Sequence, residues 1–178
     1  MANLKIDFFD GFKSETTPSS IIATQESGPI QAVTILDKKS SGVDGGDSSN
    51  TPIVRELNTL QGDTSFVSLS NNAFTLEPGT YKISWTAPAV AADRHRTALH
   101  DGTNYVAMGS SEFANSGVFS ATTSHGSYVA EIASSTTYTV QHSVETPRQF
   151  NGHGVETASA LPFTQDEVYA VVEIEKII

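Results

Sequence analysis

Five histidines are the side chains of this sequence best suited to metal binding or acid–base chemistry. None of them falls in an H-x-H or H-E-x-x-H pattern, so their spacing gives little support to a zinc site. His100-Asp101 and His142 could share a site only if their strands are neighbours. We therefore expect these histidines to lie at strand ends and to hydrogen-bond to backbone groups.

The densest group of charges is Asp93-Arg94-His95-Arg96. One interpretation is an acid–base group centred on His95. The other places Arg94 and Arg96 on one face of a strand, where they pair with carboxylates of the same or a neighbouring subunit. We favour the second, because a histidine between two cations has a lowered proton affinity and no partner at a defined spacing.

Other motifs with possible chemistry are weak. Asp44-Gly45-Gly46-Asp47 has too few oxygen ligands for a calcium loop and is more typical of a flexible acidic linker. The sequence has no cysteine, no G-x-S-x-G elbow, no glycine-rich phosphate loop and no pair of catalytic carboxylates. We expect a protein that is not an enzyme and that carries no cofactor or metal.

The polar loop from Glu145 to Pro162 is a candidate contact surface, because long glycine-rich loops with an aromatic commonly bind ligands. A contact between subunits is an equally good interpretation. Tyr81 and Trp85 could stack on a sugar, but they share one face of a strong strand and are expected in the core. The candidate contact residues come from the charged strand and from this loop: Arg94, Arg96, Arg148, Phe150, Asn151 and His153.

Composition excludes some partners. The formal net charge is −10, and no cluster of Lys and Arg occurs that could neutralise phosphates, so we expect neither nucleic acid nor an anionic membrane as a partner. The first residues contain no long apolar run, which argues against a secretory signal or a membrane span. A chain without cysteine suits synthesis in a reducing cytoplasm.

The elements that must position these residues are strands. Tyr81, Ile83 and Trp85 alternate with polar residues, as in a half-buried strand, and similar runs recur to the closing segment 168–178. Asn71-Asn72 and Asp101-Gly102 suggest turns, and so do Glu77-Pro78-Gly79, as a type II turn, and His125-Gly126. Eight or so strands at roughly 8–12-residue spacing predict an all-β, antiparallel jelly-roll β-sandwich.

The sequence suggests a head domain preceded by an extended arm. Lys38 to Pro52 is rich in Gly, Ser and Asp, so we place a boundary there, with an attachment arm and linker at 1–50 and a jelly-roll head at 51–178. A short strand is expected from Ile30 to Leu36. Apolar and polar residues alternate near the start of the arm, so this segment could add a strand to a partner's sheet. The attachment residues are Leu4, Ile6, Phe8 and Phe9.

Three motifs resemble a known superfamily. They are F-x-L-x-x-G-x-Y at Phe74 to Tyr81, T-Y-T-V-Q-H at Thr137 to His142, and the closing E-V-Y-A-V-V-E-I. In this order they resemble the jelly-roll heads that phage fibre and other virion proteins share with the tumour-necrosis-factor and complement-head superfamily. The resemblance covers residues 53–178 and not the arm.

The resemblance implies a homotrimer whose N- and C-terminal strands lie close together at its base, displayed on a virion surface. The arm would then join other virion proteins. Fifty residues offer no coiled-coil or β-helical shaft, which favours a capsid decoration or cement protein. The alternatives are a short tail-fibre or tail-tip protein that recognises host surface glycan, and a free lectin-like module. A histidine near the trimer axis could bind an ion or make the trimer sensitive to low pH.

Overall fold

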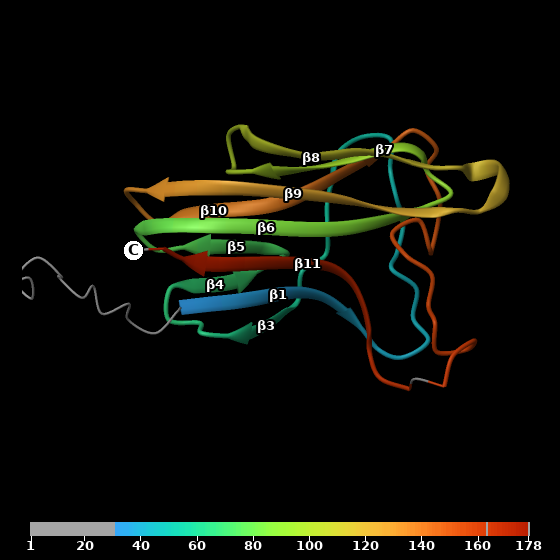
Figure 1. Cartoon of the computed structure of the whole chain (residues 1–178), viewed down its shortest axis with the longest axis horizontal. Coiled ribbons are helices and arrows are strands. Elements are labelled where there is room, and N and C mark those ends of the chain that lie inside the picture. The colour runs from blue at the N-terminus through green and yellow to red at the C-terminus, as the bar shows by residue number, and fades with distance from the viewer. Residues whose placement is uncertain (1–30, 163, 178) are drawn as a thin grey trace, which may run out of the picture.

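A computed structural model describes residues 31–162 and 164–177, and this part of the chain forms two facing antiparallel sheets (Figure 1). One sheet holds, in spatial order, β3 (Thr59–Gly62), β1 (Gln31–Lys39), β11 (Glu167–Lys176), β6 (Gly79–Val90) and β9 (Ala121–Ile132). The other holds β4 (Val67–Ser70), β5 (Ala73–Leu76), β10 (Thr136–Val144), β7 (Asp93–His100) and β8 (Tyr105–Ala114), and β2 (Ile53–Val54) also pairs with β10. The predicted all-β jelly-roll sandwich is confirmed.

Helical structure within the described residues includes one 3₁₀ turn, η3 (Ser116–Val118). No helix in these ranges is long and apolar enough to cross a membrane.

The core follows the predicted alternation. On β6, Tyr81, Ile83 and Trp85 point between the sheets, and each is at most 1% exposed. Burying an apolar side chain of this size stabilises a fold by about 1.5–3 kcal/mol, so these three positions contribute strongly to the sandwich. Phe66 stacks on Tyr81 with ring centroids 5.5 Å apart, which ties the start of β4 to the same core.

The described chain starts and finishes at one end of the sandwich. β11 lies between β1 and β6, and Gln31 faces Lys176 across the β1–β11 pair. This arrangement matches the neighbouring terminal strands that the resemblance implies. The segments 40–50, 115–120, 145–162 and 164–166 gather at the opposite end (Figure 1).

Two of the four expected turns form at strand junctions as predicted. Asn71 and Asn72 join β4 to β5 with φ of 51° and 64°, the left-handed backbone that a type I′ turn requires. Asp101 Oδ1 accepts hydrogen bonds from the backbone N–H groups of Thr103 and Asn104 and so holds the β7–β8 turn. The segment Glu77-Pro78-Gly79 also joins two strands, but Gly79 is already part of β6 and has φ of 157°. That value is not typical of a type II turn.

The turn expected at His125-Gly126 is wrong, because both residues lie inside the continuous strand β9. Gly126 faces Trp85 across the β6–β9 pair, and a Cβ at Gly126 would lie 1.9 Å from Cζ2 of the indole ring. The glycine therefore makes room for Trp85 and does not mark a turn.

Replacing Gly126 with Ala should destabilise the protein by about 1–3 kcal/mol or more, because the added methyl group overlaps a fully buried indole ring. Urea unfolding followed by tryptophan fluorescence measures this loss. Gly117→Ala is the matched control, since a Cβ there meets only the side chain of Asn115 at 3.3 Å. Equal stabilities of the two variants would contradict this role for Gly126.

The boundary expected near residue 51 differs from the structure. The short strand predicted from Ile30 exists as β1, and it pairs with β11 on one side and β3 on the other. Val33 and Ile35 of this strand are buried in the main core. The head therefore begins by residue 31, and residues 1–30, with the attachment candidates Leu4, Ile6, Phe8 and Phe9, lie outside the described residues.

The segment expected as a linker packs against the loop that follows β10. Gly45 N–H donates to the carbonyl oxygen of Gly154 at 2.9 Å, and Ser48 N–H donates to that of Arg148 at 2.8 Å. A Cβ at Gly45 would lie 2.7 Å from the carbonyl carbon of His153. Glycine is therefore required here for the close approach of two backbones. Asp44 and Asp47 accept hydrogen bonds from backbone N–H groups of the same loop.

Candidate functional site

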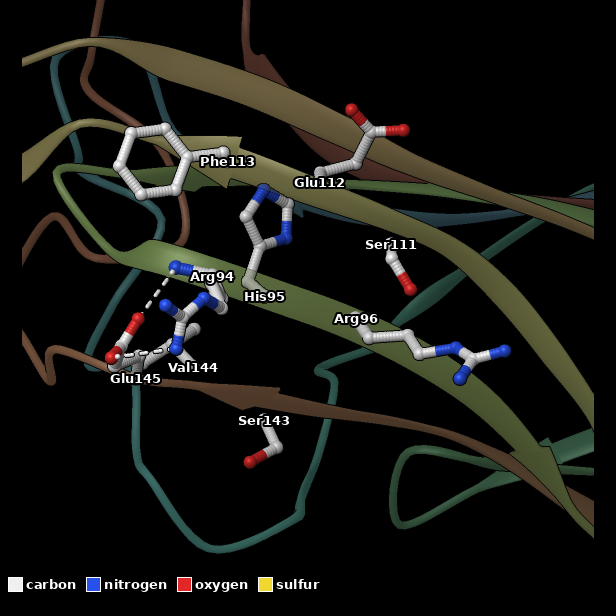
Figure 2. A pocket seen from close by; sticks show the side chains of 9 residues that line it. All are labelled: Arg94, His95, Arg96, Ser111, Glu112, Phe113, Ser143, Val144 and Glu145. Atoms are coloured by element: carbon white, nitrogen blue, oxygen red, sulfur yellow. Dashed lines mark hydrogen bonds and ion pairs between the residues drawn. The ribbon is translucent and has the colours of Figure 1, made fainter.

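A hollow of about 630 Å³ lies on the outer face of β7, β8 and β10 (Figure 2). A smaller hollow of about 190 Å³ adjoins it and shares Arg96 and Ser143. We call the two together the outer groove. The larger hollow is lined by Arg94, His95, Arg96, Ser111, Glu112, Phe113, Ser143, Val144 and Glu145. The smaller is lined by Pro52, Arg96, Thr97, Ala98, Tyr105, Met108, Gln141, His142 and Ser143.

Strand alternation explains why these side chains meet. On β7 the exposed residues Arg94 and Arg96 alternate with His95 and Thr97, which are buried. Cross-strand pairing places Phe113 of β8 opposite Arg94, and it places Ser143 of β10 opposite Arg96. The groove is thus built on three hydrogen-bonded strands, which hold its side chains at fixed spacing.

The arginines on this face have different partners. Arg94 pairs with Glu145 at 3.2 Å, as expected, but its side chain is 80% exposed, so the pair contributes little to stability. Arg96 does not pair with a carboxylate of the described residues. Its Nε–H donates to the carbonyl oxygen of Gly109 at 2.9 Å, which fixes the guanidinium group and leaves its two terminal nitrogens toward the surface. The expectation of a carboxylate partner is therefore correct for Arg94. Arg96 has no carboxylate partner within the described residues of its own chain, and a partner from a neighbouring subunit stays a prediction.

Beneath the groove, His95 points into the sandwich and contacts a second histidine. His95 Nδ1 lies 3.0 Å from Nε2 of His142, and His95 Nε2 lies 2.7 Å from Oγ1 of Thr122. His142 Nδ1 lies 3.4 Å from Nη1 of Arg55. Both histidines are at most 3% exposed. The chain of contacts thus runs from Arg55, which follows β2, through His142 of β10 and His95 of β7 to Thr122 of β9.

The donors in this chain can point in only one direction. A guanidinium group has no acceptor, so His142 Nδ1 must accept from Arg55 and its proton must sit on Nε2. That proton is donated to His95 Nδ1, so His95 in turn carries its proton on Nε2 and donates it to Thr122. The pattern requires both rings to be neutral, because a protonated ring would lose its acceptor nitrogen.

Arg55 anchors this chain from a fully buried position. Its Nη2 lies 3.5 Å from Oδ2 of Asp37, a residue of β1 that is also 0% exposed. Arg55 also donates to the carbonyl oxygens of Pro88 and His153. Both carboxylate oxygens of Asp37 and Nε of Arg55 make no hydrogen bond within the described residues. Within the part of the chain that the structure describes, the Coulombic attraction of the pair, with help from Lys39 at 3.7 Å, offsets the cost of burying this carboxylate.

His153 is the third buried histidine, and its expected place at the surface is wrong. It is 5% exposed, and its ring stacks on His142 with centroids 5.3 Å apart and an angle of 4° between the planes. Its Nε2 is buried without a hydrogen-bond partner in the described part of the chain. The loop after β10 therefore folds inward over the histidine chain and is held there by Arg55.

Burial dominates the pKa values of these groups. It lowers the pKa of His142 and of His153 to about 2, and the nearby charge of Arg55 lowers both further. Burial also lowers the pKa of His95, although Glu112 opposes this. The pKa of Asp37 is raised to about 6 by burial, against the attraction of Arg55 and Lys39, and burial lowers the pKa of Arg55 to about 10. At neutral pH the histidines are neutral and the Asp37–Arg55 pair is charged.

Replacing Arg55 with Met should destabilise the protein by about 3–5 kcal/mol, because Asp37 would remain buried without its cation. The double variant Asp37→Asn with Arg55→Met should recover part of this loss. Urea unfolding at pH 7 measures all three proteins. Arg94→Met is the matched control, because it removes an arginine from an exposed pair and should cost less than about 1 kcal/mol. The interpretation fails if the two single variants lose equal stability.

Acid should destabilise the fold below about pH 6.5. There the unfolded chain protonates its histidines, at their ordinary pKa of 6.5, while the folded chain keeps His142 and His153 neutral. Stability is therefore full above this pH and is lost as the pH falls through it. Asp37 opposes the loss, since its carboxylate takes up a proton in the folded state near pH 6 and in the unfolded state only near 3.8.

His153→Phe should flatten this dependence, because the variant keeps an aromatic ring against His142 and removes one group that gains a proton on unfolding. The slope of stability between about pH 6 and 5 should fall by roughly 1.4 kcal/mol per pH unit. Urea titrations at a series of pH values measure the slope. His125→Gln, at an exposed position of β9, controls for the loss of a histidine as such. An unchanged slope in the Phe variant would remove His153 from the acid response.

The remaining loop candidates lie at the end of the sandwich and not in the outer groove. The guanidinium carbon of Arg148 sits 4.4 Å from the ring centroid of Phe119, and its Nε–H donates to Asn151. Phe150 is 74% exposed with a left-handed φ of 66°. The loop therefore has a fixed, partly exposed surface, but its arginine is already occupied by Phe119 and Asn151.

Sequence reasoning missed Asp37, Arg55 and His142 as a connected group. The signal was present as period-two alternation. Arg55 is in phase with Ile53 and Leu57, and His142 is in phase with Val140 and Val144. A polar side chain at an inward position of a strand must find buried partners. The position of Arg55 and His142 in the apolar–polar alternation therefore predicts a buried polar network by itself. His153 lies on a loop and gives no such signal.

Comparisons with known proteins agree with this fold. No family model and no curated protein matches the chain by sequence. Among solved structures, the globular domain of zebrafish complement 1qA protein matches with a TM-score of 0.53 and 14% identity, over 83% of this chain and 98% of that one. Murine APRIL at pH 5.0 matches with a TM-score of 0.48 and 8% identity, over 83% and 99% of the two chains.

The complement likeness shows that the chain shares the fold of that globular domain. This agrees with the jelly-roll fold that the three sequence motifs suggested. At 14% identity the likeness extends to the fold alone. The phage origin in the sequence analysis stays a prediction.

Proposed function

We propose that the chain is a non-enzymatic binding head that self-associates as a homotrimer and is displayed on the surface of a phage virion. The observation that carries the binding role is the outer groove. Its larger hollow, of about 630 Å³, lies on three paired strands and is lined by aromatic, cationic, acidic and hydroxyl side chains. Such mixed, rigid surfaces suit recognition.

The perturbed ionisable groups support binding more than catalysis. His95 and His142 use their ring nitrogens to contact one another, Arg55 and Thr122. Protonating them would break these contacts, so they serve the fold as neutral groups. Arg94 and Arg96 reach the surface in the outer groove, where they are placed to contact a partner.

Self-association is supported by the outer face of the other sheet, formed by β3, β1, β11, β6 and β9. This face exposes Val129 by 58% and Val168 by 46%, and Phe119 is 49% exposed beside it. Pro88, Phe119 and Val168 line a further hollow of about 400 Å³ there. These residues form an apolar patch at one end of a face that also exposes Lys82, Glu173 and Glu175. Such a patch, bordered by charges, is suited to contact with a second and third copy of the chain.

The motif resemblance supports the place on a particle. In its first form the proposal is a capsid decoration or cement protein, held to other virion proteins by the segment with Leu4, Ile6, Phe8 and Phe9. The second form is a short tail-fibre or tail-tip protein that recognises host surface glycan. The outer groove favours this second form, because its exposed aromatics are suited to a sugar.

Removal of residues 1–30 should leave a folded trimer that no longer joins particles, because β1 and the whole core remain. Native mass spectrometry should give three times the mass of one chain for both the full and the shortened protein. Removal of residues 1–50 is the contrasting variant and should prevent folding, since it deletes β1. Incorporation of the shortened protein would contradict attachment by the arm, and a monomeric mass for the full chain would contradict the trimer.

A further inference from the structure

We infer that the outer groove binds a carboxylate-bearing sugar, with the carboxylate on Arg96 and the sugar ring against Tyr105. The inference rests on the proposed role as a binding head, and it names the ligand class of that same groove. It does not depend on where on a particle the head is displayed.

Arg96 is the first part of this site. Its guanidinium group is fixed by the hydrogen bond to Gly109, and it pairs with no carboxylate in residues 31–162 and 164–177. This is unusual in a chain of net charge −10, where Lys38 and Lys82 both have acidic partners. The terminal nitrogens present two parallel donors, the geometry that a carboxylate matches best. Figure 2 shows the side chain extending along β7, away from Arg94.

Tyr105 is the second part. Its ring is 46% exposed, yet two contacts hold it in place. The hydroxyl group donates to Oε1 of Gln141 at 3.0 Å, and the edge of the ring meets His100 with centroids 5.0 Å apart. An exposed aromatic ring that is already fixed loses little entropy when a flat ligand stacks on it. Arg96 and Tyr105 line the same hollow of about 190 Å³.

The surroundings of these two residues favour a sugar. Pro52, Ala98 and Met108 supply an apolar floor, while the amide of Gln141 and the hydroxyl of Ser143 lie beside it. A pyranose has one apolar face and a rim of hydroxyl groups, which this mixture matches. An acyl chain would require an enclosed apolar cavity, but here Tyr105 and Met108 are nearly half exposed. An acidic peptide shares the carboxylate and is separated from a sugar by the experiment.

The test uses the full chain and pairs of uronic-acid oligosaccharides that differ only in methyl esterification of the carboxylates. The free acids should bind, measured by isothermal titration calorimetry and on a glycan array, and the esters should bind at least about tenfold more weakly. Arg96→Gln should cause a similar loss of affinity for the free acids. Tyr105→Ala should weaken binding several-fold for all sugars in the series.

Lys82→Gln is the matched control, because it removes an exposed cation from the outer face of the other sheet and should leave binding unchanged. Unfolding of each variant in urea separates a binding defect from a folding defect. Equal binding of acids and esters, an unaffected Arg96→Gln variant, or capture of acidic peptides without any sugar would each overturn the inference.

Failure of this inference is distinguishable from failure of the proposed function. If the chain forms trimers and joins particles but no oligosaccharide binds, the binding head survives and the ligand class is wrong. If the full chain is monomeric and absent from particles but binds the free acids, the site survives and the virion role is wrong.

Discussion

The buried ion pair between Arg55 and Asp37 is the interaction on which the rest of this structure depends. Arg55 contacts β1 through Asp37, β6 through the carbonyl of Pro88 and the end loop through the carbonyl of His153. It also fixes the tautomer of His142, and through it that of His95. One cation thus connects both sheets and the loop that closes the sandwich. Because buried pairs seldom add net stability, its value lies in specifying this one arrangement.

Most of the fold could be predicted from the sequence, because strand alternation is a local property. The alternating residues Tyr81, Ile83 and Trp85 show which face of their strand is buried without reference to any partner strand. In the same way, the residue types Asn71-Asn72 favour the left-handed backbone of their turn. The same rule extends to the buried network. Arg55 and His142 occupy inward positions of their strands, so their burial was predictable, although the identity of their partners was not.

What could not be predicted depends on contacts between distant segments. Gly45 looks like a linker residue, and only the opposing backbone of His153 shows that a side chain there would clash. Gly126 looks like a turn, and only Trp85, across a strand pair, shows otherwise. Glycine has the same local signature whether it permits a turn or a close approach. Arg96 is a similar case. Its Nε–H bonds to the carbonyl oxygen of Gly109 and its terminal nitrogens stay free in the described part of the chain, but the sequence does not indicate that contact.

The two faces of β7 divide structural and surface roles between adjacent residues. His95 and Thr97 point inward and use their polar atoms to hold β9. Arg94 and Arg96 point outward from the same backbone. A one-residue shift of β7 in register would exchange these faces and place two cations in the core, so the inward contacts also fix the outward ones. The buried histidine chain therefore acts on the groove without touching a ligand, because it holds the strand that presents Arg96.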